Sequence, residues 1–130
     1  AVNRRGRIRL MIEKEGVNAD VICRFLDRLM VGSKTPVFLI WDGHPMHKSG
    51  KVAKKLRATK ASLHLLPAYS PELNPGEGVW REVKSHRLCR AGIFSFDDMK
   101  SKALGALRFL LNRPDIVRSF FLTPTTQYAA

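Results

Sequence analysis

The stretch VFLIWD at residues 37–42 decides the fold class of this chain. Its five successive apolar residues leave no polar position for solvent, which predicts a strand covered on both faces. Such strands form the parallel centre of α/β sheets. The run ends in an acid, Asp42, and ligands of these sheets gather at the carboxyl ends of strands. Asp42 is therefore the first candidate site residue.

The flanking patterns predict alternating helices and strands. Alternation of apolar and polar residues indicates a strand, and apolar residues three or four apart indicate a helix. We expect strands at 8–12 and 62–66, helices at 18–32, 48–60 and 75–88, and two closing helices that begin near Ser95 and Pro114. Ser95 and Asp98 fit a capping box, with Phe94 and Met99 placed as a hydrophobic staple. The sequence therefore predicts one α/β domain over residues 1–130.

The charge balance favours a nucleic-acid partner. The 23 Lys and Arg residues against 11 acids give a formal net charge of +12, and such a positive field attracts polyanions. No apolar run reaches the roughly 20 residues that a membrane span needs. Cys23 and Cys89 lack metal-ligand spacing and are interpreted as reduced thiols of a cytoplasmic protein. Because the chain begins with Ala1 and not Met, we expect it to be part of a longer reading frame.

Asp42 has two interpretations. A carboxylate at a strand end is costly unless a cation meets it, and a divalent metal ion is a common partner. Alternatively, its side chain caps the turn formed by Gly43, His44 and Pro45, as Asp often does.

Glu77 also has two interpretations. The residues NPGE at 74–77 fit a capping box, with Asn74 as N-cap and Glu77 reaching back to it. On the other hand, Glu77 shares a helix face with Trp80, Arg81 and Lys84, where a carboxylate beside basic residues could face a site of metal and phosphate.

The helix after Asp42 is strongly basic. Within the stretch 48–60 no acid relieves the positive charge, so phosphate contacts explain it better than a merely solvated face does. Binding of that kind is salt-sensitive and indifferent to base sequence. The candidate DNA-binding residues are Lys48, Lys51, Lys54, Lys55, Arg57 and Lys60 of this helix, with Arg81 and Lys84 of the later one.

Two longer strings carry a family resemblance: WDGHPMHK at 41–48 and LPAYSPELNPGEGVW at 66–80. Together they resemble the DDE transposases and are similar to the bacterial insertion-sequence branch of the mariner superfamily. In that family the second acid ends a strand and is followed by a His, which His47 matches. The third acid lies in a Pro-x-Tyr-Ser-Pro-x-x-Asn-Pro-x-Glu-x-x-Trp motif. The 34 residues between positions 42 and 77 also match the family spacing.

The resemblance implies a ribonuclease H-like fold, with a mixed sheet flanked by helices, and a metal-dependent DNA transposase. Asp42 and Glu77 would be catalytic and would hold two Mg²⁺ or Mn²⁺ ions, with His47, Asn74 and Trp80 in support. Hard cations of this kind prefer carboxylate oxygens. The implied partners are double-stranded DNA, at transposon ends and at the target, and a second copy of the chain in a homodimer. The implied place of action is the bacterial nucleoid.

The chain departs from the family pattern at its start. The first catalytic Asp of the family lies upstream of the segment that matches Ala1, and Asp20 falls in the first turn of a helix, where it complements the helix dipole. We therefore expect a truncated domain without its first, central strand, inactive or nearly so by itself. One alternative is a basic DNA-binding remnant without catalytic activity. Another is a ribonuclease H-like nuclease with no role in transposition.

Overall fold

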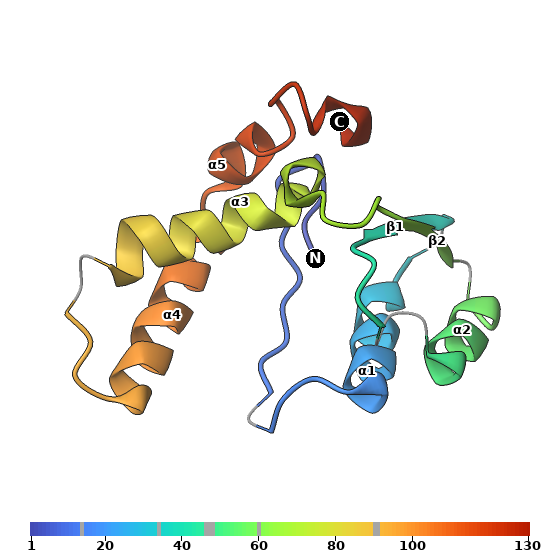
Figure 1. The fold of residues 1–130 in the computed structure, drawn as a ribbon, viewed down its shortest axis with the longest axis horizontal. Coiled ribbons are helices and arrows are strands. Elements are labelled where there is room, and N and C mark those ends of the chain that lie inside the picture. Colours follow the sequence, from blue (N-terminus) through green and yellow to red (C-terminus); the bar gives the residue numbers. More distant parts are fainter. Residues whose placement is uncertain (14, 34, 46–48, 60, 90–91) are drawn as a thin grey trace. The chain divides into compact units, whose positions relative to one another are not determined.

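The computed structural model describes residues 1–13, 15–33, 35–45, 49–59, 61–89 and 92–130, without the side chains of residues 86–87 (Figure 1). In chain order the elements are α1 (Ala19–Met30), β1 (Val37–Trp41), α2 (Gly50–Arg57), β2 (Ala61–Leu65), η2 (Pro71–Leu73), α3 (Pro75–Arg81), η3 (Glu82–Leu88), α4 (Phe96–Leu111), α5 (Pro114–Ser119) and η4 (Gln127–Ala129). This order of helices and strands confirms the predicted α/β class. None of the described helices combines the length and the apolar character needed to cross a membrane.

The chain forms two compact units. One consists of Leu10–Pro71, and the other joins Ala1–Arg9 to Glu72–Ala130. We call them the sheet unit and the helical unit, and each is described by itself. The expectation of one domain over residues 1–130 stays a prediction.

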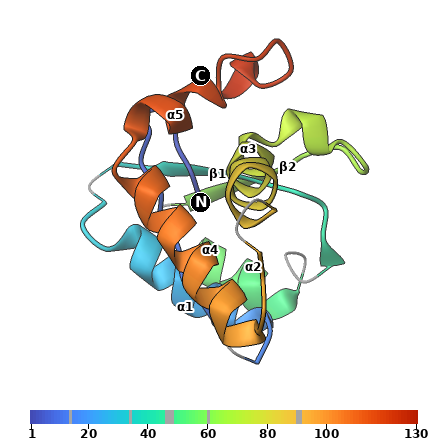
Figure 2. The same cartoon turned by 90° about the vertical axis from the view of Figure 1, so that its left-hand side faces the viewer.

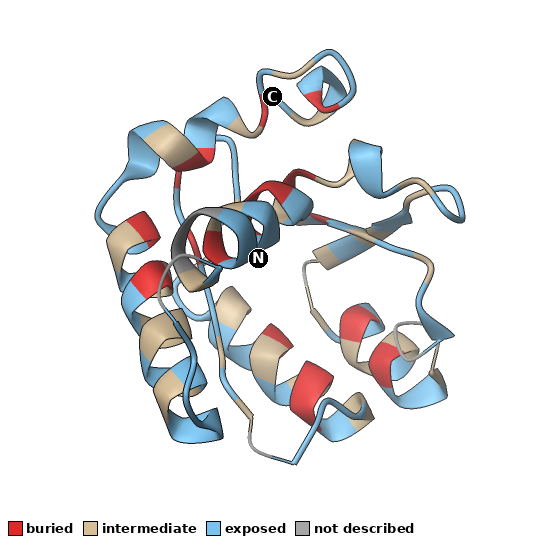
Figure 3. Ribbon diagram, turned by 60° about the vertical axis from the view of Figure 1, so that its left-hand side comes forward, coloured by how far each residue is buried: buried red, intermediate tan, exposed pale blue. Residues whose placement is uncertain are grey.

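The sheet unit is built on two parallel strands and two helices. β1 pairs with β2 in a register that runs from Val37 opposite Ala61 to Trp41 opposite Leu65. Figure 3 shows the buried positions of α1 and α2 in red. The core of this unit joins one strand residue to residues of both helices: Ile22, Leu26, Leu39, Val52 and Leu56.

One face of β1 is open in the part of the chain that the structure describes. Leu39 is buried, whereas Phe38 is 70% exposed and Ile40 is 38% exposed. Successive side chains of a strand point to opposite faces, so the helices that bury Leu39 leave its two neighbours uncovered. The prediction that both faces of residues 37–41 are covered is therefore wrong for this structure.

The helices of the sheet unit begin where their capping residues place them. The Oδ1 atom of Asn18 accepts a hydrogen bond of 3.0 Å from the backbone N–H of Val21. Ser49 caps α2 in the same way through Val52. After α1, Gly32 takes a φ of 76°, a left-handed conformation that suits glycine. These contacts confirm the predicted helix starts and the stop at Gly32 to within one or two residues.

The helical unit packs three helical segments around one core. α3 continues without interruption into η3, a π-helical segment, and Figure 2 shows this helix almost end-on with α4 and α5 beside it. The fold brings residues from all of them together in one buried cluster: Ile8, Val79, Val83, Ala106, Leu110 and Val117. The N-terminal turn fits closely against α5, because a Cβ atom on Gly6 would lie 2.3 Å from the carbonyl oxygen of Pro114.

The strand predicted at 8–12 does not form. Ile8 makes only an isolated antiparallel bridge with Val2, and Leu10 and Ile12 are 38% and 44% exposed. A strand needs a neighbour for its backbone hydrogen bonds. Arg9 exchanges backbone hydrogen bonds with Ala1, at 2.9 Å and 2.7 Å, and none of the described residues supplies such a partner beyond Arg9. The predicted strand is therefore wrong for this structure.

The start of α4 is also partly as predicted. Ser95 Oγ accepts from the Asp98 N–H at 3.1 Å, and Asp98 Oδ2 accepts from the N–H of Phe94 at 3.2 Å. The hydrophobic staple is wrong, because Phe94 is 91% exposed. Its ring lies instead beside the Lys102 ammonium, 5.4 Å from the ring centroid, a cation–π contact.

Candidate active site

Asp42 is the residue that follows β1, and its side chain is exposed. Its Oδ1 accepts a hydrogen bond of 3.3 Å from the backbone N–H of His44, as the turn-capping interpretation predicts. The backbone N–H of Leu66 donates to the carbonyl oxygen of Trp41 at 2.7 Å. This bond holds the start of the next loop against the same end of the sheet. Asp42 therefore lies at the carboxyl end of the strand pair, where the sequence places it.

Glu77 lies in the first turn of α3 with an exposed side chain. Asn74 is the N-cap, and its Oδ1 accepts from the N–H of Gly76 at 2.9 Å. The return half of the capping box is not made: within the described ranges, no hydrogen bond to the Glu77 carboxylate is found. The capping interpretation is therefore correct for Asn74 and wrong for Glu77. The exposed Glu77 carboxylate complements the helix dipole from the first turn, and it accepts no hydrogen bond from the described residues that would keep it from a ligand.

The two carboxylates belong to different compact units. Asp42 lies in the sheet unit and Glu77 in the helical unit. Their juxtaposition in one metal site stays a prediction. Among the residues that the structure describes, no group of three His, Cys, Asp or Glu side chains is placed to hold a metal ion.

Of the supporting residues, Asn74 acts as the N-cap described above. Trp80 is 51% exposed, so packing against the core does not account for it. Its position three residues after Glu77 places it on the same side of α3. The prediction for His47 lies outside the described residues, as does that for Lys48.

The basic helix α2 is partly neutralised by acids of α1. Lys55 Nζ lies 2.5 Å from Asp27 Oδ1, and Lys51 pairs with Asp20. The hydrogen bond from Lys51 to Asp20, helped by the negative charge of that carboxylate, raises the pKa of Lys51. The stretch 48–60 contains no acid, but the fold supplies two from a helix 30 residues earlier in the chain. The sequence of α2 by itself therefore overstates how much of its positive charge is left without an acidic partner.

The other candidate DNA-binding residues that the structure describes are exposed. Lys54 and Arg57 of α2 form no ion pair with any described residue, and they are both solvent-facing. In the helical unit Arg81 ends α3 and Lys84 lies in η3, and both are exposed. Lys60 lies outside the described residues. The two exposed cations of α2 and the two of the α3–η3 helix are therefore the best-placed candidates for phosphate contacts.

Two features near the candidate site carry no clear sequence signal. Tyr69, in the loop between β2 and η2, is 102% exposed at a φ of 55°. Its side chain is therefore not held by packing against the described residues. The π-helical geometry of residues 82–88 is the second feature; π-helical turns are rare and frequently occur at functional sites.

The described part of the chain thus has exposed carboxylates after β1 and in the first turn of α3, and exposed cations on α2, α3 and η3. Comparison with known families shows which family the chain belongs to. Residues 1–100 match the model of the DDE superfamily endonucleases, so the chain belongs to that family. The match includes Asp42 and Glu77 and leaves out residues 101–130. No curated protein and no solved structure matches the chain.

Proposed function

We propose that this chain is the catalytic segment of a DDE transposase of the insertion-sequence branch of the mariner superfamily. It would cut phosphodiester bonds at transposon ends and join those ends to target DNA in the bacterial nucleoid. The observation that carries the proposal is Glu77: it occupies the acidic position of the long loop motif, and its exposed carboxylate makes no hydrogen bond with the described residues. Membership of the endonuclease family supports it.

The donor set fits Mg²⁺ or Mn²⁺. These ions prefer carboxylate oxygens, and Asp42 and Glu77 both present them at the surface. Asp42 and Glu77 would hold such ions, which when bound would supply activation of the attacking water or 3′-hydroxyl and stabilisation of the leaving oxygen. Further ligands would come from a carboxylate outside the pair, so the chain by itself is expected to be nearly inactive.

The exposed cations have a separate role. Lys54 and Arg57 on α2, with Arg81 and Lys84 on the α3–η3 helix, would contact DNA phosphates and hold the duplex at the site. Lys51 and Lys55 would contribute less, because each already neutralises an acid of α1. Assembly as a homodimer stays a prediction.

A second candidate function is DNA binding without cleavage. The net charge of +12 favours it, since charge alone is enough for tight, sequence-indifferent binding. The two functions differ in what they require of the carboxylates. Cleavage depends on Asp42 and Glu77, whereas simple binding does not need them.

The deciding experiment is a nicking assay on a transposon-end duplex, with protein produced from the complete reading frame. We expect cleavage that requires Mg²⁺ or Mn²⁺ and that is lost in Asp42→Asn and in Glu77→Gln, while both variants still bind the duplex. Glu72→Gln is the matched control, because Glu72 is an exposed acid five positions before Glu77. Binding without nicking in the unaltered protein would favour the second function.

A further inference from the structure

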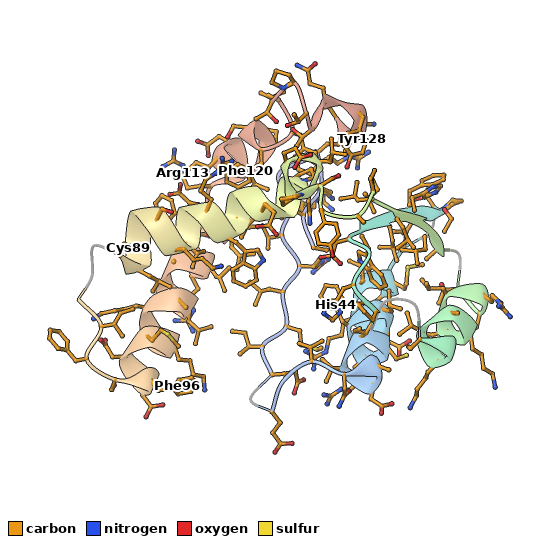
Figure 4. All side chains as sticks on the ribbon, viewed as in Figure 1. His44, Cys89, Phe96, Arg113, Phe120 and Tyr128 are labelled. Atoms are coloured by element: carbon orange, nitrogen blue, oxygen red, sulfur yellow. The ribbon has the colours of Figure 1, made fainter. Side chains whose placement is uncertain are left out.

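The C-terminal segment of the helical unit touches the start of α3 at two points, one on each side of Glu77. Before it, the hydroxyl of Tyr128 donates a hydrogen bond of 2.6 Å to the carbonyl oxygen of Leu73, 55 positions earlier in the chain. After it, the ring of Phe120 lies against Gly78, so that a Cβ atom there would be 2.5 Å from Phe120 Cγ. Figure 4 labels both aromatic residues, which lie near the first turn of α3.

The segment that carries these two side chains is itself held together. Thr126 is 4% exposed, and its hydroxyl donates to the carbonyl oxygen of Phe120 at 2.8 Å. The hydroxyls of Thr123 and Thr126 lie 2.7 Å apart, and Phe121 is buried. Internal bonds of this kind give the segment a fixed shape, so the contacts at its two ends act together.

Glu77 depends on its backbone for its position. Its carboxylate makes no hydrogen bond with the described residues, so only the first turn of α3 fixes it. First turns fray easily because their N–H groups lack partners within the helix. Asn74 supplies one such partner to Gly76, and the contacts at Leu73 and Gly78 restrain the turn from both sides.

We propose that residues Phe120–Tyr128 form a brace that holds the first turn of α3, and that Tyr128 is a positioning residue for the Glu77 carboxylate. The brace lies beyond residues 1–100, the part that matches the endonuclease family, so family membership does not assign it. The proposal rests on the proposed function of Glu77 as a ligand of a divalent ion. Burial raises the pKa of the Tyr128 hydroxyl, which keeps it protonated and able to donate at neutral pH.

A brace matters because a metal ligand works only in a narrow range of positions. Ligands must be held within about 0.5 Å of a productive geometry by their supporting contacts. A first turn that opens part of the time presents the carboxylate correctly only part of the time. Apparent metal affinity then falls by the fraction of time that the correct arrangement is populated.

The test compares Tyr128→Phe with Tyr69→Phe in the chain as it exists. Both remove one hydroxyl, but Tyr69 is fully exposed and its hydroxyl has no hydrogen bond to lose among the described residues. The first readout is amide hydrogen exchange at Glu77, whose N–H donates to the Asn74 carbonyl oxygen at 3.0 Å. The second is Tb³⁺ luminescence sensitised by Trp80, which lies one turn from Glu77 and reports an ion bound there.

The brace predicts that Tyr128→Phe speeds exchange at Glu77 about fivefold, the factor that corresponds to the usual net contribution of a hydrogen bond. It also predicts a weaker Tb³⁺ affinity in that variant, with no change in either readout for Tyr69→Phe. If the unaltered chain binds Tb³⁺ and Tyr128→Phe binds it equally well, the positioning role is overturned while the proposed function stands. If Glu77→Gln leaves Tb³⁺ binding unchanged, the proposed function itself is wrong.

Discussion

The ring of Phe120 lies so close to Gly78 that a Cβ atom at position 78 would be 2.5 Å from Phe120 Cγ. Gly78→Ala should therefore force the ring or α3 to shift, and we expect a loss of about 1–3 kcal/mol in unfolding free energy. Gly105→Ala is the matched control, because Gly105 lies inside α4 with nothing within 4 Å of its added Cβ. There the helix propensity of Ala should stabilise the protein by about 0.5–1 kcal/mol. Urea denaturation of both variants measures the contrast, and equal effects would contradict this packing.

Tyr69 is held in a left-handed backbone conformation, at a φ of 55°, with a fully exposed side chain. Such a conformation costs a residue with a Cβ roughly 1–2 kcal/mol, whereas glycine adopts it freely. After allowing for the extra chain entropy of glycine, Tyr69→Gly should raise the free energy of unfolding by about 0.5–1 kcal/mol. Tyr69→Ala, which keeps the Cβ, should leave it nearly unchanged. A destabilising Tyr69→Gly substitution would show that the side chain has contacts in the folded protein.

The Arg113 guanidinium donates to both carboxylate oxygens of Asp115, at 2.9 Å and 2.7 Å, and this hydrogen bonding lowers the pKa of Asp115 to about 2. A lowered folded-state pKa means that the contribution to stability is complete above the unfolded value, near 4. It is lost as the pH falls toward 2. In Arg113→Gln the NMR titration midpoint of the Asp115 carboxyl should move up toward its ordinary value. An unchanged midpoint would show that Arg113 is not the cause.

Lys54 and Arg57 are the exposed cations of α2 that form no ion pair with described residues. If they contact phosphates, the double variant Lys54→Gln/Arg57→Gln should flatten the salt dependence of duplex binding by up to about two units of logarithmic slope, since each contact contributes about 0.9. Arg108→Gln/Arg118→Gln changes the net charge equally at exposed positions of α4 and α5. Titrations of duplex DNA at several salt concentrations give the slope for each of the two double variants. Equal slopes in both variants would mean that only net charge matters.

Local patterns predicted the elements of this fold well. Asn18 caps the helix that begins after it, Pro75 begins α3, and residues 37–41 form a strand parallel to β2. These features depend on neighbours in the sequence, such as a side-chain oxygen within three residues of a free N–H group. Such information is fully present in a short stretch of chain.

Features that depend on distant partners were not predictable in this way. Residues 8–12 have the pattern of a strand, but residues 10–12 lack a pairing partner among the described residues. Phe38 is exposed because the helices cover only the other side of β1. The charge of α2 is relieved by acids of α1. At the candidate site, the sequence places Glu77 in the first turn of the helix that the structure shows as α3, and its role as a metal ligand stays a prediction. It gave no indication that Tyr128 bonds to the carbonyl oxygen just before the N-cap.

Asp42 and Glu77 are proposed to hold divalent ions together, and a double-mutant cycle of Mn²⁺ affinity, followed by electron paramagnetic resonance, measures whether they do. Asp42→Asn and Glu77→Gln should each weaken Mn²⁺ binding, whereas the control Glu72→Gln should not. If the two carboxylates share a site, the effect of the double variant will differ from the sum of the two single effects. Mn²⁺ affinities that are unchanged in both single variants, or that fall equally in the Glu72→Gln control, would show that the two carboxylates do not form a metal site.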